Sequence, residues 1–101
     1  MVTFSVIIPA FDEEKTIEKT LKALKNQTFK DFEIIVKDGG SRDRTVEIAK
    51  KYADKVVCKS DCSAANARNQ GADYAKSVFL VFVDADTQLP KDTLERFAHL
   101  I

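Results

Sequence analysis

The chain has 101 residues, 45% hydrophobic and 32% charged, the composition of an ordinary globular domain rather than of a disordered or fibrous protein. Sixteen basic and sixteen acidic residues cancel to a net charge of zero. Nucleic acid is therefore not expected as a partner, because its binders usually carry a basic excess. We expect no membrane span and no secretion signal, since the apolar runs are short. With only two cysteines, a cytoplasmic protein is expected, and peripheral membrane association stays open.

Four short runs of strand-forming residues, 4–8, 32–36, 55–58 and 78–83, alternate with longer stretches of helical character. The first and last runs are apolar on both faces, as expected of strands that helices cover on both sides. Each interval has room for a helix and two turns, which a crossover between parallel strands needs.

The stretches between the predicted strands have the spacing of amphipathic helices. In the first, Ile17, Leu21 and Leu24 form one apolar stripe. In the last, Phe97 and Ile101 are expected to face the core together with Leu94. The predicted caps or first turns are at Asp12, at Ser41, at Ser63 for an alanine-rich helix over 64–75, and at Pro90.

The alternation of strands and helices predicts a Rossmann-like α/β domain with a parallel sheet of about four strands and helices on both faces. Right-handed crossovers and the habits of this class favour the strand order 3-2-1-4. The topological switch point then lies between the first and fourth strands, and ligands of open α/β sheets bind there, outside the carboxyl ends of the strands.

Carboxylates follow three of the four predicted strands: residues 12–14 after the first, Asp38 after the second, and Asp84 and Asp86 after the fourth. Oxygen ligands massed at one sheet edge suit Mg²⁺ or Mn²⁺ that also holds a substrate phosphate. Alternate residues of an extended segment point the same way, so Asp84 and Asp86 can face one site. The competing interpretation of this D-x-D triplet is a solvated turn before the last helix.

Two interpretations of the segment 38–41 also stand side by side. Gly39 and Gly40 can form a tight turn that Ser41 caps. Alternatively, Asp38 accepts a hydrogen bond from a nucleobase N–H while the glycines let the ligand approach. A zinc site at Cys58 is not favoured, because the sequence has only two cysteines and one histidine.

Four motifs stand in order along the chain: SVIIPAFDEE at 5–14, DGGSRDRT at 38–45, ARNQG at 67–71 and FVDAD at 82–86. Their order and spacing resemble the nucleotide-sugar-binding half of the family 2 glycosyltransferases. The resemblance covers essentially the whole chain, and four motifs in register are far more specific than any one of them.

The resemblance implies a GT-A half domain that binds a UDP- or GDP-sugar and transfers the sugar, with inversion, to an unknown saccharide or lipid acceptor. In that family the aspartate matching Asp38 contacts the base, and the arginine matching Arg68 lies near the nucleotide. Of the D-x-D pair, Asp84 approaches the ribose or the metal, and Asp86 holds Mg²⁺ or Mn²⁺ on the diphosphate. The segment that frames the nucleoside is matched by Pro9, Ala10, Phe11 and Glu13.

The chain departs from the family pattern in three respects. Gly39 replaces the second aspartate that often precedes the glycine–serine turn, and Phe11 replaces a common tyrosine but keeps a stacking face. Family catalytic domains are longer, and their second half supplies the acceptor site and the catalytic base, which no residue here matches. We therefore interpret residues 1–101 as a single donor-binding domain of an inverting glycosyltransferase, apparently truncated before the acceptor-binding half.

Truncation would leave the strand at 78–83 as an open hydrophobic edge, so a homodimer through this region or the last helix is expected. The main alternative function is a non-catalytic nucleotide-sugar-binding or assembly module of the same fold. A receiver domain is disfavoured because Pro9, Ala10 and Phe11 delay the acids after the first strand. A dinucleotide-binding domain is disfavoured because no G-x-G-x-x-G follows that strand.

Overall fold

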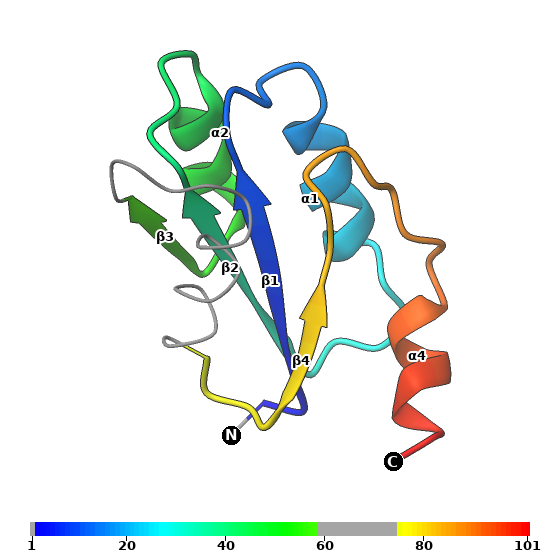
Figure 1. Cartoon of the computed structure of the whole chain (residues 1–101). Coiled ribbons are helices and arrows are strands. Elements are labelled where there is room, and N and C mark those ends of the chain that lie inside the picture. The colour runs from blue at the N-terminus through cyan, green and yellow to red at the C-terminus, as the bar shows by residue number, and fades with distance from the viewer. Residues whose placement is uncertain (1, 59–74) are drawn as a thin grey trace.

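The computed structural model describes residues 2–58 and 75–101 of the chain. The predicted helix over 64–75 and its cap at Ser63 lie outside the described residues. The elements are β1 (Phe4–Ala10), α1 (Ile17–Lys25), β2 (Phe32–Asp38), α2 (Thr45–Tyr52), β3 (Lys55–Cys58), β4 (Phe79–Phe82) and α4 (Thr93–Ala98) (Figure 1).

The four strands form one parallel sheet in the order β3-β2-β1-β4, which confirms the predicted order. The central strand β1 pairs with β2 from Phe4↔Phe32 to Ala10↔Asp38, and with β4 from Phe4↔Phe79 onward. In Figure 1 the arrowheads of β1, β2 and β4 point toward the same edge of the sheet. The carboxyl ends of these strands therefore meet at one edge, as the sequence predicts.

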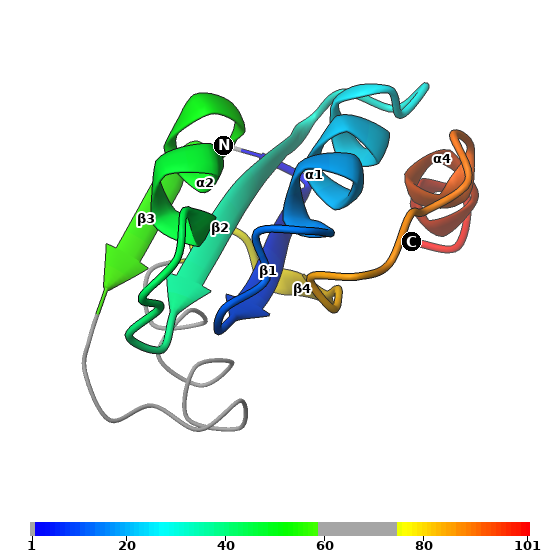
Figure 2. The same cartoon turned by 90° about the horizontal axis from the view of Figure 1, so that it is seen from above.

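Helices α1 and α2 lie side by side on one face of the sheet (Figure 2). The main core fills the space between them and this face, and every residue of the predicted α1 stripe is fully buried there. A second cluster, formed by Ile7, Ile35 and Val57 with Ala75 packed against it, lies on the opposite face. Alternation along β1 and β2 thus gives the sheet two apolar faces, as two-sided burial requires.

Three predicted helix starts are wrong, and so is one predicted helix face. Helix α1 begins at Ile17 rather than directly after Asp12. Helix α2 begins at Thr45 rather than near Ser41. Helix α4 begins at Thr93, whose backbone N–H and hydroxyl both donate to the carbonyl of Pro90, so the proline precedes the helix. Phe97 is 40% exposed and Ile101 is 60% exposed, so neither faces the core as expected.

Strand β4 forms an edge of the described sheet and carries an apolar surface. Phe97 extends this surface onto α4, where its ring packs edge-on against Phe4 at 6.5 Å. The exposed large apolar side chains of the edge patch, as we call it, are Val78, Phe79, Leu80, Phe82, Phe97, Leu100 and Ile101. Among the described residues, none of the helices is both long and apolar enough to span a bilayer.

Gln27 ties the end of α1 to the start of α4. Its side chain is fully buried and donates to the carbonyl of Pro90 at 2.7 Å, while its amide oxygen accepts from the Leu94 N–H at 3.1 Å. Without Gln27 the buried Leu94 N–H would lack its partner, at a cost of about 1–3 kcal/mol, whereas the Pro90 carbonyl keeps its bonds from Thr93.

Gln27→Ala is therefore expected to lower the free energy of unfolding by about 1–3 kcal/mol, measured by urea denaturation. Amide hydrogen exchange should also become faster in α4, because the tie to α1 is lost. Lys25→Ala, at an exposed position on the same helix, serves as the control. Unchanged exchange in α4 of Gln27→Ala would contradict the assigned role.

Candidate functional site

The loops that follow β1 and β2 are joined by hydrogen bonds at the carboxyl edge of the sheet. The Gly39 N–H donates to the carbonyl of Ala10 at 2.8 Å and so extends the strand pairing by one residue. Beyond it, the Asp12 N–H donates to the Ser41 hydroxyl, and the Asp12 carboxylate accepts from the Arg42 N–H, both at 2.8 Å. Asp12 is thus a link between the two loops and not a cap of α1.

Asp12 has a φ of 51°, in the left-handed region that aspartate tolerates better than most residues. This turn brings the next two backbone N–H groups toward the start of α2. The Glu13 N–H donates to the Thr45 hydroxyl at 2.8 Å, and the Glu14 N–H donates to the Asp43 carboxylate at 3.2 Å. The two loops therefore form one hydrogen-bonded unit.

The Asp43 carboxylate accepts hydrogen bonds from both the hydroxyl and the backbone N–H of Thr45, the first residue of α2. Although desolvation acts to raise it, these bonds and the one from Glu14 hold the pKa of Asp43 below its usual range. Ser41 therefore does not cap α2 as predicted: the N-cap is Arg44, and the Asp43 carboxylate accepts the N–H of the first helical residue.

The Asp38 carboxylate holds the glycine turn in place. Its Oδ2 accepts from the N–H groups of Gly40 and Ser41 at 2.9 and 2.8 Å, and its Oδ1 accepts from the Ser41 hydroxyl. Gly40 has a φ of 101°, a conformation that costs a residue with a side chain considerably more. The predicted glycine turn is therefore present, but Ser41 does not cap α2, and the contact of Asp38 with a base stays a prediction.

Asp84 and Asp86 both have exposed side chains at the end of β4, on either side of the buried Ala85. The carbonyl of Ala85 accepts a hydrogen bond from the Thr20 hydroxyl of α1 at 2.8 Å. The Thr87 N–H donates to the carbonyl of Asp84 at 3.0 Å and closes the turn. The D-x-D segment is thus anchored to the core between its two carboxylates.

Within the described ranges, no three histidine, cysteine or acidic side chains come together as a ready-made metal site. Asp84 and Asp86 nevertheless offer the hard carboxylate oxygens that Mg²⁺ and Mn²⁺ prefer. An ion that takes its other ligands from substrate phosphates and water needs only one or two protein carboxylates. The donor set therefore fits a substrate-bridging ion rather than a protein-enclosed one.

The other predicted site residues lie at the same edge but differ in exposure. Pro9 and Ala10 are buried at the end of β1, whereas the next residue, Phe11, is 54% exposed. Glu13 is half-buried, and its carbonyl accepts from the backbone N–H groups that begin α1. Arg68 lies outside the described residues.

No sequence motif singles out Lys37, although the structure places it at this edge. Lys37 is the residue before Asp38 and is fully buried. Its position near the end of a predicted strand is typical of a solvated lysine, so only the three-dimensional packing distinguishes it. Likewise, local sequence gives no signal that Asp12 bonds Ser41 and Arg42 or that Asp43 bonds Glu14, because these partners lie 29 or 30 residues away along the chain.

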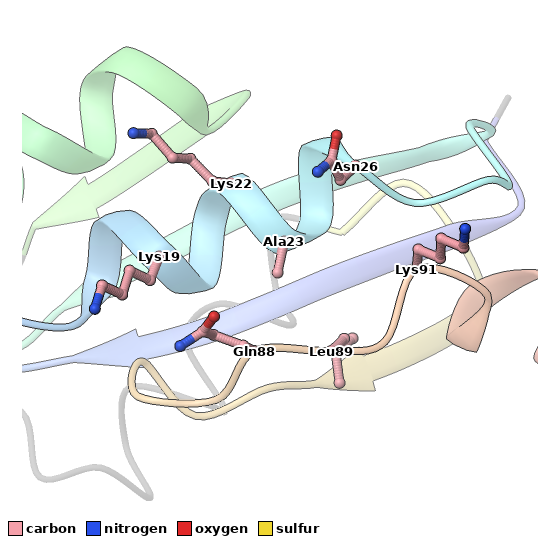
Figure 3. A pocket seen from close by; sticks show the side chains of 7 residues that line it. All are labelled: Lys19, Lys22, Ala23, Asn26, Gln88, Leu89 and Lys91. Carbon is pink, nitrogen blue, oxygen red and sulfur yellow. The ribbon is translucent and has the colours of Figure 1, made fainter.

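A cationic groove of about 680 Å³ runs between α1 and the segment before α4 (Figure 3). Lys19 and Lys22 line it from α1, and Gln88 and Lys91 line it from the opposite wall. Lys22 forms an exposed ion pair with Glu18 at 3.7 Å. The groove contains none of the predicted donor-site residues and is a feature separate from the carboxylates of the sheet edge.

Comparison with known proteins identifies the class to which this arrangement belongs. Residues 5–101 match Glycosyl transferase family 2. The poly(ribitol-phosphate) β-N-acetylglucosaminyltransferase TarS of Staphylococcus aureus is 36% identical over 109 residues, covering 100% of this chain and 19% of TarS. The chain belongs to the family 2 glycosyltransferases, which confirms the resemblance seen in the sequence.

Solved structures support the same assignment. The crystal structure of S. aureus TarS 1–349 in complex with UDP-GlcNAc superposes with a TM-score of 0.83 and 35% identity, covering 99% of this chain and 31% of that one. The mannosyltransferase PcManGT from Pyrobaculum calidifontis, in complex with GDP-Man and Mn²⁺, gives 0.78 and 26%, covering 90% and 30%. The sheet therefore has the GT-A fold, and the chain spans about a third or less of these proteins.

Asp43→Asn tests the link between the loops through its pH dependence. Because folding lowers the pKa of Asp43, its stabilisation is fully present above the unfolded-state pKa of about 4 and is lost as the pH falls through the lower folded-state value. The variant should be less stable than the wild type near pH 7, and the difference should shrink toward pH 2–3.

Chemical denaturation at a series of pH values measures this difference. Glu95→Gln, which removes an exposed carboxylate on α4, is the matched control and should leave the pH profile unchanged. A difference between Asp43→Asn and wild type that stays constant down to the lowest pH would contradict the assignment.

Proposed function

We propose that the chain is the donor-binding half of an inverting glycosyltransferase and binds a nucleoside diphosphate sugar at the carboxyl edge of its sheet. The observation that carries this proposal is the convergence of three strand ends, with Asp38 on one side of β1 and Asp84 and Asp86 on the other. The bound UDP-GlcNAc of TarS and GDP-Man of PcManGT support the substrate class.

Sheet geometry gives the nucleotide an orientation. Strands β2 and β4 are separated by β1, so their ends lie two strand spacings apart, about 10 Å. That separation suits a nucleoside diphosphate whose diphosphate lies at the D-x-D segment and whose base lies near Asp38. Phe11, exposed at the end of β1 between them, offers an aromatic face for stacking.

Asp84 and Asp86 would hold Mg²⁺ or Mn²⁺, and the Mn²⁺ in the PcManGT structure supports a divalent ion of this kind. When bound, such an ion supplies Lewis-acid stabilisation of the departing diphosphate. The anchoring of Ala85 by Thr20 keeps the two carboxylates at the edge. Asp84 would also approach the ribose. Arg68 would add a fixed positive charge near the nucleotide.

Asp38 accepts the N–H of the base with the lone-pair capacity that the glycine turn leaves on its carboxylate. Pro9, Ala10 and Glu13 frame the nucleoside through the linked loops. Because those loops are already joined by hydrogen bonds, binding requires little further ordering of the backbone.

Sugar transfer further needs a carboxylate base and an acceptor site, which we assign to a second half of the enzyme. Residues 1–101 would be a single donor-binding domain, matching about a third of the neighbouring glycosyltransferase structures. The acceptor would be a saccharide or a lipid. Donor hydrolysis or sugar transfer by the 101-residue chain alone distinguishes a complete catalyst from a non-catalytic binding module of the same fold.

Thermal-shift titration tests donor binding directly. UDP, GDP and ADP are added with and without Mn²⁺, and a bound nucleotide stabilises the fold by about 2.7 kcal/mol at a hundredfold excess over Kd. We expect a Mn²⁺-dependent rise in Tm with UDP or GDP that Asp86→Ala abolishes, because the diphosphate loses its link to the protein.

Glu95→Ala removes an exposed carboxylate on α4 and should leave the nucleotide response intact. A folded wild-type chain that responds to none of the nucleotides would overturn the proposal. A response that persists in Asp86→Ala would instead remove the metal role from that residue.

The edge patch on β4 and α4 leads us to propose a homodimer. Val78 is 89% exposed and Leu100 is 83% exposed, and both line hollows on the patch. An unpaired hydrophobic edge strand favours association with a second strand, and a second copy of the chain supplies one.

Size-exclusion chromatography with light scattering at tens of micromolar should give a dimer mass for the wild type. The double variant Val78→Lys and Leu100→Lys should be monomeric, because each buried interface would then contain an unpaired charge. Lys51→Glu, on α2 and outside the patch, changes the charge without this effect. A monomeric wild type would exclude the proposed dimer.

A further inference from the structure

Lys37 is a charged residue that is buried inside the fold. Its side chain is fully buried in β2, and its Nζ has no hydrogen-bond partner among the described residues. A buried ammonium without a partner is costly, and such groups are normally paired or hydrogen-bonded. Because the fold nevertheless contains this charge, we expect a bound ligand to supply the hydrogen-bond acceptor.

The register places Lys37 beside the predicted nucleoside segment. It pairs with Pro9 of β1 on one side and with Val57 of β3 on the other. Successive strand residues face opposite ways, so Lys37 belongs to the face away from α1 and α2, the face of the Ile35 cluster. It stands one residue from the end of β2, and so next to the carboxyl edge.

The positive charge of Lys37 acts on the thiol of Cys58, at the end of β3. Burial, and then the carboxylate of Asp38, raise the pKa of the Cys58 thiol, and the positive charge of Lys37 opposes this rise. The thiol lies 3.6 Å from Oδ2 of Asp38. The ammonium therefore acts on the same small region as the carboxylate, at the ends of β2 and β3.

We propose that the Lys37 ammonium donates a hydrogen bond to the nucleobase carbonyl that adjoins the N–H accepted by Asp38. This inference rests on the proposed function and adds a specificity-determining residue to it. The carbonyl is O4 if the base is uracil and O6 if it is guanine. The flexible four-carbon stem of lysine lets the ammonium approach the edge from the face opposite Asp38.

The base rather than the diphosphate is the expected partner because of the strand order. The D-x-D segment follows β4, two strands away from Lys37, and a metal-bound diphosphate lies there. A neighbouring donor and acceptor, Lys37 and Asp38, match a base edge that carries a carbonyl next to an N–H. Uracil and guanine have this edge, whereas cytosine and adenine have an amino group next to an unprotonated nitrogen.

Lys37→Met separates this role from a structural one. Methionine keeps much of the volume and removes the buried charge, so the ligand-free variant should have a higher Tm than the wild type. With Mn²⁺ present, isothermal titration should show about 10- to 100-fold weaker binding of UDP or GDP, whichever the wild type prefers. Binding of CDP or ADP should change little, so that base selectivity is largely lost.

An atomic substitution in the ligand identifies the carbonyl. The probe is 4-thio-UDP or 6-thio-GDP, which keeps the N–H and replaces the oxygen with sulfur, a weaker acceptor. The wild type should bind the thio nucleotide several-fold more weakly than the parent, and Lys37→Met should bind the two equally. Lys51→Met, at an exposed position on α2, is the matched control and should behave as the wild type.

Three outcomes would overturn the inference while leaving donor binding intact. These are unchanged UDP or GDP affinity in Lys37→Met, an equal loss for all four nucleotides, or a variant that still discriminates against the thio nucleotide. A lower ligand-free Tm in Lys37→Met would also overturn it, because the ammonium would then have a structural partner. A wild type that binds no nucleotide would overturn both this inference and the proposed function.

Discussion

The parallel pairing of β1 with strands on both sides is the constraint on which the rest of the structure depends. All seven residues of β1 are buried, and β2 and β4 run in the same direction along its two edges. Pairing with both neighbours sets the register, from Phe4↔Phe32 to Ala10↔Asp38 on one side and from Phe4↔Phe79 onward on the other. Chain segments that are distant in sequence, at 38–45 and 84–86, are thereby brought to one edge.

Patterns of apolar residues were sufficient to predict the four strands and the presence of α1, α2 and α4. Ile17, Leu21 and Leu24 occupy one helix face because their spacing matches the helical repeat, and the structure buries all three. The strand order also follows from chirality and class habits, which depend little on individual residues. Prediction failed where a local motif had a distant partner: Ser41 bonds Asp38 and Asp12 instead of capping α2.

The candidate site could likewise be predicted only in part from the sequence. The sequence indicates which carboxylates reach the carboxyl edge, because that depends only on where each strand ends. It leaves two interpretations open for segment 38–41, a glycine turn and a base contact of Asp38. The structure shows the turn, and the Asp38 carboxylate, which had no predicted part in it, holds it in place. Lys37 could not be recognised from sequence, because its burial arises from residues that surround it in space and its neighbours in sequence give no indication of it.

The charged side chains at the carboxyl edge of the sheet, together with the strand order, explain how a chain of zero net charge could select an anionic nucleotide. In the proposed function, Asp84 and Asp86 would hold a divalent cation between the β4 end and the diphosphate. Lys37, at the other side of β1, carries a positive charge without a hydrogen-bonding acceptor among the described residues. In the proposed binding mode, the metal-bound phosphates would lie at the β4 end and a base carbonyl would lie at Lys37 of β2. The one central strand that separates these two ends sets a spacing that suits a ligand of about nucleotide length.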